Sequence, residues 1–179
     1  MFSKDCLFLI NCSTTKVVID NDSKTVFVRG SKSGQEKKWF ENGRKRNKRN
    51  WKNGLKEGLQ RRWENEQKVC EIYWKNGKKE GFERHWYTGG QKWTEWNLKN
   101  GLQDGLQQEW YENGQKLIEC TWKDGKTDGL EQKWYDSGRK EFEINWKNGK
   151  QDGLERWSYE SGQKYYEANW SNGVLTNIE

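Results

Sequence analysis

Polar and apolar residues alternate along most of this chain, in short runs that glycines interrupt about every dozen residues. Within residues 111–135, one turn lies at Gly114 and another at Gly125, and the runs between the turns end at Trp122 and Trp134. Glycine at this frequency disfavours helix, whereas alternation with a period of two is typical of a half-buried β-strand. The pattern therefore predicts a series of β-hairpins.

The same unit returns along the chain at steps of 23 or 24 residues. The second turn of each copy is usually Asn-Gly or Asp-Gly, the strongest short-range signal for a hairpin. The first turn recurs at Gly43, Glu66, Gly90, Gly114, Gly138 and Gly162. The second recurs at Gly54, Gly77, Gly101, Gly125, Gly149 and Gly173, and a third glycine at Gly58, Gly81, Gly105, Gly129 and Gly153. We expect this third glycine to let a neighbouring tryptophan lie close to the backbone.

Aromatic residues fall into two columns when the copies are superposed. One holds Trp51, Trp74, Trp122, Trp146 and Trp170, with Leu98 in the same place and Trp96 shifted by two residues. The other holds Trp39, Trp63, Trp86, Trp110 and Trp134, with Trp157 displaced by one residue. Because these residues recur in copy after copy, we interpret Gly114, Trp122, Gly125, Gly129 and Trp134 as structural.

These observations predict an all-β protein: an elongated, single-layer antiparallel β-meander or solenoid of repeated ~24-residue hairpins with an N-terminal β cap. Residues 1–29 would form the cap or a degenerate first repeat, and residues 30–179 one continuous domain of hairpins. The strand register stays open, because a shift of one residue would place the two tryptophan columns on the same face or on opposite faces.

The formal net charge of +6 is distributed unevenly. Residues 1–90 carry 21 Lys/Arg against 11 Asp/Glu, whereas residues 91–179 carry 12 against 16. Acidic and basic residues also recur in columns, such as Glu119 and Lys116 with their equivalents, as expected for a solvated face with cross-strand pairs.

Catalytic and metal chemistry find little support. The sequence has one histidine, His85, and cysteines at 6, 12, 70 and 120 without CxxC spacing. No zinc site, disulfide framework or nucleophile–base set is indicated, and residues repeated in every copy cannot all be catalytic. We expect a non-enzymatic protein without a cofactor. Reduced cysteines, together with no convincing signal peptide or membrane span, favour an intracellular setting.

One segment departs from the repeat pattern. Residues 44–62 carry nine basic side chains against one acid, Glu57, and Lys48 stands where other copies have glutamate. The candidates for binding an anionic partner are Arg44, Lys45, Arg46, Lys48, Arg49, Lys52, Arg61 and Arg62. Such a cluster can contact a lipid surface, an acidic protein or, with less support, nucleic acid, but it can also serve only to protect a sheet edge. Three aromatic residues at variable positions, Trp93, Trp96 and Tyr165, are further candidates for partner contacts.

The sequences WYENGQK (110–116) and WKNGK with DGL (146–154) closely resemble the MORN-repeat family, and in particular its bacterial and large-virus variant of the YwqK-like antitoxin type. The resemblance spans roughly residues 27–176. It implies a twisted antiparallel sheet with one hairpin per repeat, acting as an interaction module. Glu66, the missing tyrosine after Trp63, and Ser158 in a tryptophan column depart from the family pattern.

Several functions are compatible with these features. The favoured hypothesis is a protein–protein interaction scaffold, with a toxin as partner if the chain is antitoxin-like. Alternatives are an anionic-surface binder that uses the basic segment, for phospholipid or nucleic acid, and a glycan-binding tryptophan-rich repeat. A homodimer formed through an exposed terminal strand is also possible.

Overall fold

The computed structural model describes residues 15–19, 24–28 and 34–178, within two compact units, 1–80 and 81–179. All regular structure among the described residues is β-strand, and consecutive paired strands are antiparallel. The predicted fold class is therefore confirmed. Much of the predicted cap lies outside the described residues, and the predicted domain boundaries stay predictions.

The first unit holds a separate two-stranded hairpin and a second sheet. The hairpin pairs β1 (Thr15–Ile19) with β2 (Lys24–Val28). In the second sheet the order is β3-β4-β6-β7, and the short β5 also pairs with β4. These strands are β3 (Gly34–Trp39), β4 (Lys45–Lys52), β5 (Leu55–Lys56), β6 (Gly58–Glu64) and β7 (Gln67–Lys75). Strand β8 (Lys78–Trp86) begins in this unit and ends in the next.

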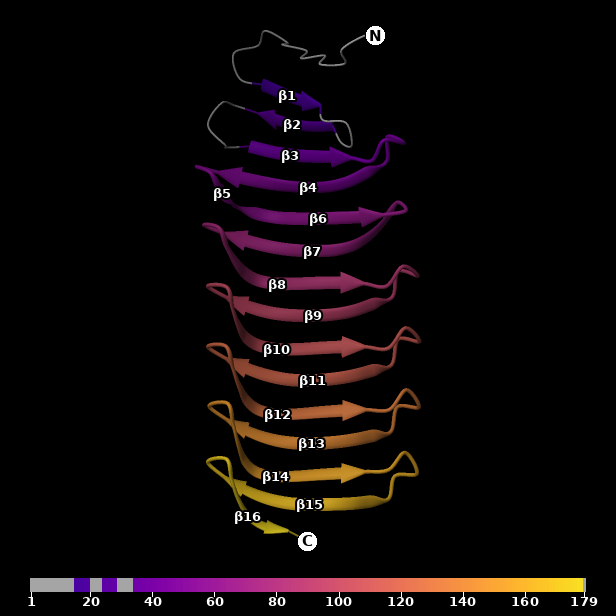
Figure 1. The fold of residues 1–179 in the computed structure, drawn as a ribbon, viewed down its shortest axis with the longest axis vertical. Helices are drawn as coiled ribbons and strands as arrows, with labels where there is room; N and C mark the ends of the chain where they lie inside the picture. Colours follow the sequence, from indigo (N-terminus) through magenta and orange to yellow (C-terminus); the bar gives the residue numbers. More distant parts are fainter. Residues whose placement is uncertain (1–14, 20–23, 29–33, 179) are drawn as a thin grey trace, which may run out of the picture. The chain divides into compact units, whose positions relative to one another are not determined.

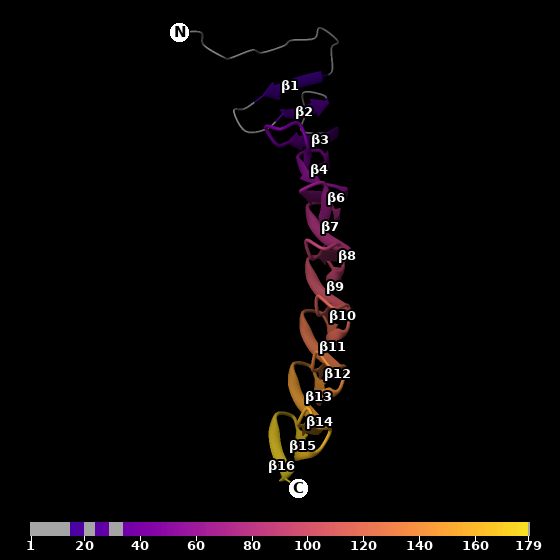
Figure 2. The same ribbon diagram turned by 90° about the vertical axis from the view of Figure 1, so that its right-hand side faces the viewer.

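In the second unit every strand pairs with the strand that follows it in sequence (Figure 1). The strands after β8 are β9 (Lys92–Lys99), β10 (Leu102–Trp110), β11 (Lys116–Lys123), β12 (Lys126–Trp134), β13 (Lys140–Lys147), β14 (Lys150–Ser158), β15 (Lys164–Ser171) and β16 (Val174–Ile178). Seen from the side, β9 to β16 form one layer (Figure 2). The predicted hairpin meander is thus present.

The two kinds of turn differ in length. Asp124 and Gly125 both have positive φ, 48° and 79°, as a two-residue type I′ turn requires. The other turn is a five-residue loop, in which the Tyr111 N–H donates to the Gln115 carbonyl and the Gly114 N–H donates to the Tyr111 carbonyl, at 2.8 and 2.9 Å. This loop returns at 40–44, 87–91, 135–139 and 159–163.

One repeat has a shorter turn, which explains its step of 23 residues. At Asn65 and Glu66 the φ angles are 47° and 67°, and Glu64 pairs with Gln67, so a two-residue turn replaces the five-residue loop. Glu66 is therefore not a simple replacement of the loop glycine, because this repeat is one residue shorter and has a different type of turn. A glutamate in the left-handed region is strained, unlike the glycines of the other copies.

The third glycine sits at a β-bulge. Gly129 has φ +116°, and the pairing of β11 with β12 shifts between Cys120 and Trp122. A Cβ on Gly129 would lie 3.2 Å from the Thr121 Cβ, and one on Gly105 or Gly153 would meet an asparagine at the same distance. Backbone conformation and the Thr121 column therefore require this glycine. The neighbour that crowds it is not the tryptophan we expected.

The register places the two tryptophan columns on opposite faces of the sheet. Cys120 and Trp122 alternate along β11 on one side, which we call the covered face. Glu119 lies on the other side, the charged face, where the Lys116 ammonium contacts both Glu119 and, at 5.2 Å, the ring of Trp134. Tryptophan therefore packs beside small apolar residues on the covered face and beside lysine on the charged face.

The core lies on the covered face. Its small apolar residues are almost fully buried, with Cys120 4 % exposed, Ile144 6 % and Ala168 0 %. Half-buried indoles such as Trp122 and Trp146 stand beside them. Burial raises the pKa of the Cys120 thiol to about 12, as expected for a small hydrophobic residue and not for a reactive cysteine.

Tyrosines at the start of the five-residue loops tie each repeat to the next. The hydroxyl of Tyr87 donates to the Trp110 carbonyl, that of Tyr111 to the Trp134 carbonyl, and that of Tyr135 to the Ser158 carbonyl, at 2.9, 2.8 and 3.0 Å. Each bond spans 23 residues. The loop edge of the second unit is therefore held by side chains as well as by the strand ladder.

Removal of one such hydroxyl should destabilise the protein. We expect Tyr111→Phe to lower the free energy of unfolding by about 1 kcal/mol, because the Trp134 carbonyl loses its donor. Urea denaturation followed by circular dichroism measures this change. Tyr159→Phe is the control, since the Tyr159 ring is 53 % exposed and its hydroxyl makes no such bond with a described residue. Equal effects of the two substitutions would contradict the role given to the hydroxyl bond.

Candidate functional site

The charged face of the second unit is neutralised within itself. In the column of Glu119 and its equivalents, each glutamate forms an ion pair with a lysine three residues before it in the same strand. Some of these glutamates also pair with an arginine of a neighbouring strand. The distances are 2.6 Å for Lys92–Glu95, 2.6 Å for Lys116–Glu119, 2.7 Å for Lys140–Glu143 and 3.2 Å for Lys164–Glu167. Arg84 and Arg156 add cross-strand pairs with Glu95 and Glu167. This part of the face is a set of satisfied ion pairs.

These contacts lower the pKa of the glutamates. Burial alone would raise the pKa of Glu95, but hydrogen bonds from Arg84 and Lys92 outweigh it, and Glu119 is lowered in the same way by Lys116 and Gln108. For Glu143 the bond from Lys140 is the largest cause of its lowered pKa. The ionised column therefore contributes to stability.

The first unit breaks this pattern with a row of three cations. Lys37 of β3 pairs with Lys48 of β4, and Lys48 pairs with Arg61 of β6, so that the three side chains stand side by side on the charged face. Only Arg61 has an acid, Glu71, at 2.7 Å on its far side. Neither lysine forms an ion pair with another described residue. Like charges directly opposite one another are destabilising. We call Lys37, Lys48 and Arg61 the cation row.

The cation row contains one residue that the sequence did not single out. Lys37 lies outside the basic segment 44–62 and joins the row only through the β3–β4 register. Its sequence neighbours, Glu36 and Lys38, give no sign of this. A register derived from the Gly34 and Trp51 repeat positions, which pair directly, could have placed it there.

The other predicted basic residues take several roles. Arg44 pairs with Glu66 at 3.1 Å and Arg62 with Glu64 at 3.4 Å, both exposed. Lys45 lies over the Trp63 ring and Arg46 over Phe40, at 5.2 and 5.4 Å. Lys52 is exposed at the end of β4. Sequence proximity therefore did not bring all eight candidates to one surface.

Arg49 lies on the covered face and serves the fold. Its guanidinium donates to both oxygens of Glu36, at 2.5 and 2.7 Å, and the Trp51 indole adds a third donor at 2.8 Å. Glu36 is 2 % exposed. Burial would raise the pKa of Glu36, but the bonds from Arg49 and Trp51 hold it below its ordinary value. Arg49 is therefore unavailable to a partner.

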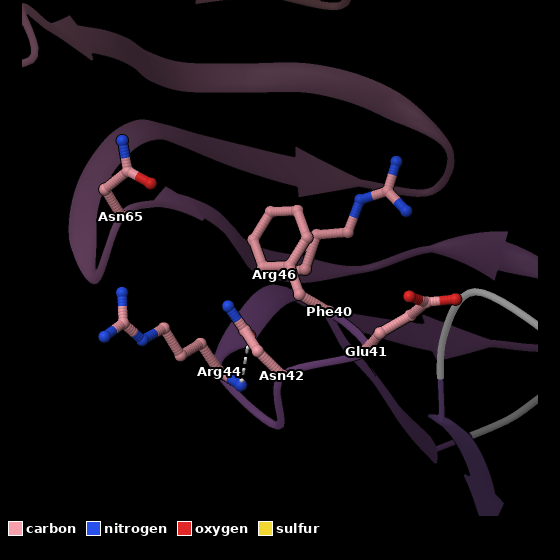
Figure 3. A pocket seen from close by; sticks show the side chains of 6 residues that line it. All are labelled: Phe40, Glu41, Asn42, Arg44, Arg46 and Asn65. Carbon is pink, nitrogen blue, oxygen red and sulfur yellow. Dashed lines mark hydrogen bonds between the residues drawn. The ribbon is translucent and has the colours of Figure 1, made fainter.

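An open hollow of about 520 Å³ lies at the loop edge of the basic segment (Figure 3). Phe40, Glu41, Asn42, Arg44, Arg46 and Asn65 line it. Arg44 and Arg46 point in different directions in Figure 3, and the Asn42 side chain accepts the Arg44 N–H at 3.1 Å. The charged groups do not converge on one point, as they would around a small anion.

The three candidate aromatic residues occupy different surroundings. Trp93 and Tyr165 are 46 % and 49 % exposed. Trp96 is half-buried in the column of Cys120 and Ile144, and its indole nitrogen is buried. Trp93 and Tyr165 are therefore placed where a partner could reach them, whereas Trp96 fills the covered face.

Two kinds of site are not indicated by the described residues. They contain no group of His, Cys, Asp and Glu side chains that could hold a metal ion. Within the same ranges there is no helix long and apolar enough to cross a membrane.

Fold and site together define a hairpin-repeat protein whose first unit carries a row of three adjacent cations. Three segments, residues 103–124, 127–148 and 151–172, match the family model described as "MORN repeat variant". Each covers one hairpin, β10–β11, β12–β13 or β14–β15. The matches support the MORN-repeat family, whose repeats are commonly non-enzymatic interaction modules. None of the curated proteins compared with the chain matches it.

Acid should weaken the fold through the glutamate column. A glutamate whose pKa is lowered in the folded state contributes stability above its ordinary value of 4.5, and this contribution is lost as the pH falls through the lowered pKa. We expect the urea midpoint to fall as the pH drops below about 4.5, and to fall less for Glu119→Gln. Glu112→Gln, in an exposed turn, should behave like the parent protein. An unchanged acid response of Glu119→Gln would contradict this account.

Reversing the central charge of the cation row should stabilise the protein. Lys48→Glu replaces two like-charge pairs, with Lys37 and Arg61, by two opposite-charge pairs, and we expect a gain of roughly 0.5–1 kcal/mol in the free energy of unfolding. Urea denaturation measures it. Lys52→Glu is the matched control, because Lys52 pairs with the uncharged Leu55. A loss of stability on Lys48→Glu would show that the row is not strained.

Proposed function

We propose that this protein is a non-enzymatic interaction module that binds an acidic surface of a protein partner through the cation row. The observation that carries the proposal is the register Lys37–Lys48–Arg61, which sets three cations beside one another. In the second unit the position equivalent to Lys48 holds a glutamate that forms an ion pair, as at Glu119 and Glu143. A position that departs from a neutralised pattern at a cost in stability is typical of a binding site.

The geometry of the row suits carboxylates presented by a protein. Neighbouring strands lie about 4.8 Å apart, so three cations span roughly 10 Å on a sheet face. Acidic side chains on an extended segment or helix can reach such a face and replace the solvent around each cation. If the partner is a toxin, as the family resemblance suggests, the module would act by covering the toxin's acidic surface.

An anionic phospholipid surface is the second candidate. Arg44 and Arg46 are exposed at the loop edge beside Phe40, an arrangement compatible with contact between a basic, aromatic edge and lipid head groups. An intracellular setting is part of both proposals and is supported by Cys70 and Cys120, which are free, buried thiols. Glycan binding and a homodimer stay predictions.

Crosslinking and pull-down from native cells test the first proposal. We expect the protein to recover a reproducible acidic partner, and Lys48→Glu to lose most of it. The matched control is Lys123→Glu, which introduces the same charge at an exposed residue of the second unit. Capture of the same proteins by both variants, or of none by the parent protein, would overturn the proposal.

Vesicle flotation separates the two candidates. Vesicles of phosphatidylcholine, with and without phosphatidylserine, are compared at low and high salt, since a charge-driven complex weakens as salt rises. Binding to the phosphatidylserine vesicles that is lost on Arg44→Glu with Arg46→Glu would favour the lipid surface.

A further inference from the structure

An open aromatic pocket of about 310 Å³ lies in the last full repeat, lined by Trp157, Tyr165 and Tyr166. The preceding repeat has Lys133 and Glu141 in the places of Trp157 and Tyr165, and these two residues form an ion pair at 2.9 Å. The last repeat therefore has two rings where its neighbour has an internal salt bridge. This pocket is separate from the cation row and belongs to the second unit alone.

Two of the rings pack against neighbouring rings. Phe142 packs against Trp157 with ring centroids 4.6 Å apart, and Phe142 is 9 % exposed. On the outer side Tyr159 stacks on Tyr165 at 4.4 Å, and both rings are about half exposed. The pocket is thus a fixed aromatic surface that remains open to solvent.

A buried carboxylate on the same face of β14 is hydrogen-bonded to Trp157. Glu155 is 6 % exposed, and its two oxygens accept the indole N–H groups of Trp157 and Trp170, each at 2.6 Å. Its remaining contact is the Gln151 side-chain amide, at 3.4 Å. No lysine, arginine or histidine of the described residues forms an ion pair with it. A carboxylate with no internal counter-ion is therefore bonded to Trp157, one of the residues that line the pocket.

Most equivalent positions in other repeats are treated differently, but Glu131 of the preceding repeat resembles Glu155: it forms no ion pair with a described residue, and burial raises its pKa. Glu36 is neutralised by Arg49, and Glu83 has His85 at 2.9 Å. The chain has Gln60 and Gln107 at the same place, which carry no charge.

In two other repeats a lysine ammonium group lies over a tryptophan ring. Lys92 lies 4.8 Å from the Trp110 ring centroid and Lys116 lies 5.2 Å from that of Trp134. For the next lysine in this series, Lys140, the sequence has Ser158 at the place that corresponds to Trp134, because the tryptophan has moved by one residue to the other face. Among the described residues, no cation lies over Trp157.

We propose that the pocket of Trp157, Tyr165 and Tyr166 binds a cationic side chain, arginine or lysine, presented by a polypeptide partner. The rings provide cation–π contacts, and Glu155 provides the opposing charge. The openness of the pocket favours a side chain over a free small cation, because the rest of the peptide can supply contacts that an open pocket cannot. The charge of the pocket disfavours an acidic ligand.

An NMR titration of the full chain with a tri-arginine peptide tests this proposal. The indole N–H signal of Trp157, assigned from Trp157→Phe, should shift on addition of tri-arginine, while a tri-citrulline peptide of the same shape without charge should leave it in place. Glu155→Gln should weaken binding roughly 3- to 30-fold, in the range of a cation–π contact reinforced by a buried charge. The fold should accept this change, since the chain already has Gln60 and Gln107 at the equivalent place.

Two further substitutions and a stability measurement distinguish binding at this pocket from binding elsewhere and from loss of structure. Tyr165→Leu should lose the shift, whereas Trp93→Leu, which alters the equivalent exposed position in another repeat, should keep it. Melting temperatures of all variants separate lost binding from lost structure. Equal binding of tri-citrulline, an unchanged affinity of Glu155→Gln in a folded protein, or an equal loss on Trp93→Leu would each overturn the proposal.

Discussion

The structure depends on burying one face of a sheet without a second layer to cover it. Indoles meet this need, because a ring such as Trp122 is broad enough to shield the small residue beside it, Cys120, which is 4 % exposed. The same arrangement requires like residues at like places in each hairpin. Repetition of the sequence, the bulge at Gly129 and the type I′ turns all follow from this one constraint.

The charged face shows how far repetition can be varied. Where Lys116 and Glu119 recur, the face is neutral and adds stability. Where Lys48 replaces glutamate, the strand pairing is unchanged, but Lys48 lies between two other cations, Lys37 and Arg61. Likewise, Trp157 and Tyr165 replace an ion pair on the other face. These departures from the repeat occur at side chains, whereas the two-residue turn at Asn65 and Glu66 is a departure in the backbone.

The fold could be predicted from the sequence because turn glycines and alternating runs are local signals. The sequence does not predict which face of the sheet each side chain occupies, because that depends on bulges such as the one at Trp134 and on the register of pairs such as Lys37 and Lys48. Arg49 illustrates the point. It belongs to the most basic segment of the chain, yet one residue of alternation turns it to the covered face and into a bond with Glu36. Trp96 is half-buried for the same reason.

The tyrosine bonds also bear on how the protein opens. In the second unit three hydroxyls link consecutive loops, but in the first unit the corresponding places hold Phe40, which has no hydroxyl, and Glu64. Local opening draws on the least tied elements first. Among the described residues, amide hydrogen exchange would therefore be faster around the loops of the first unit than around the loops that these three hydroxyls link.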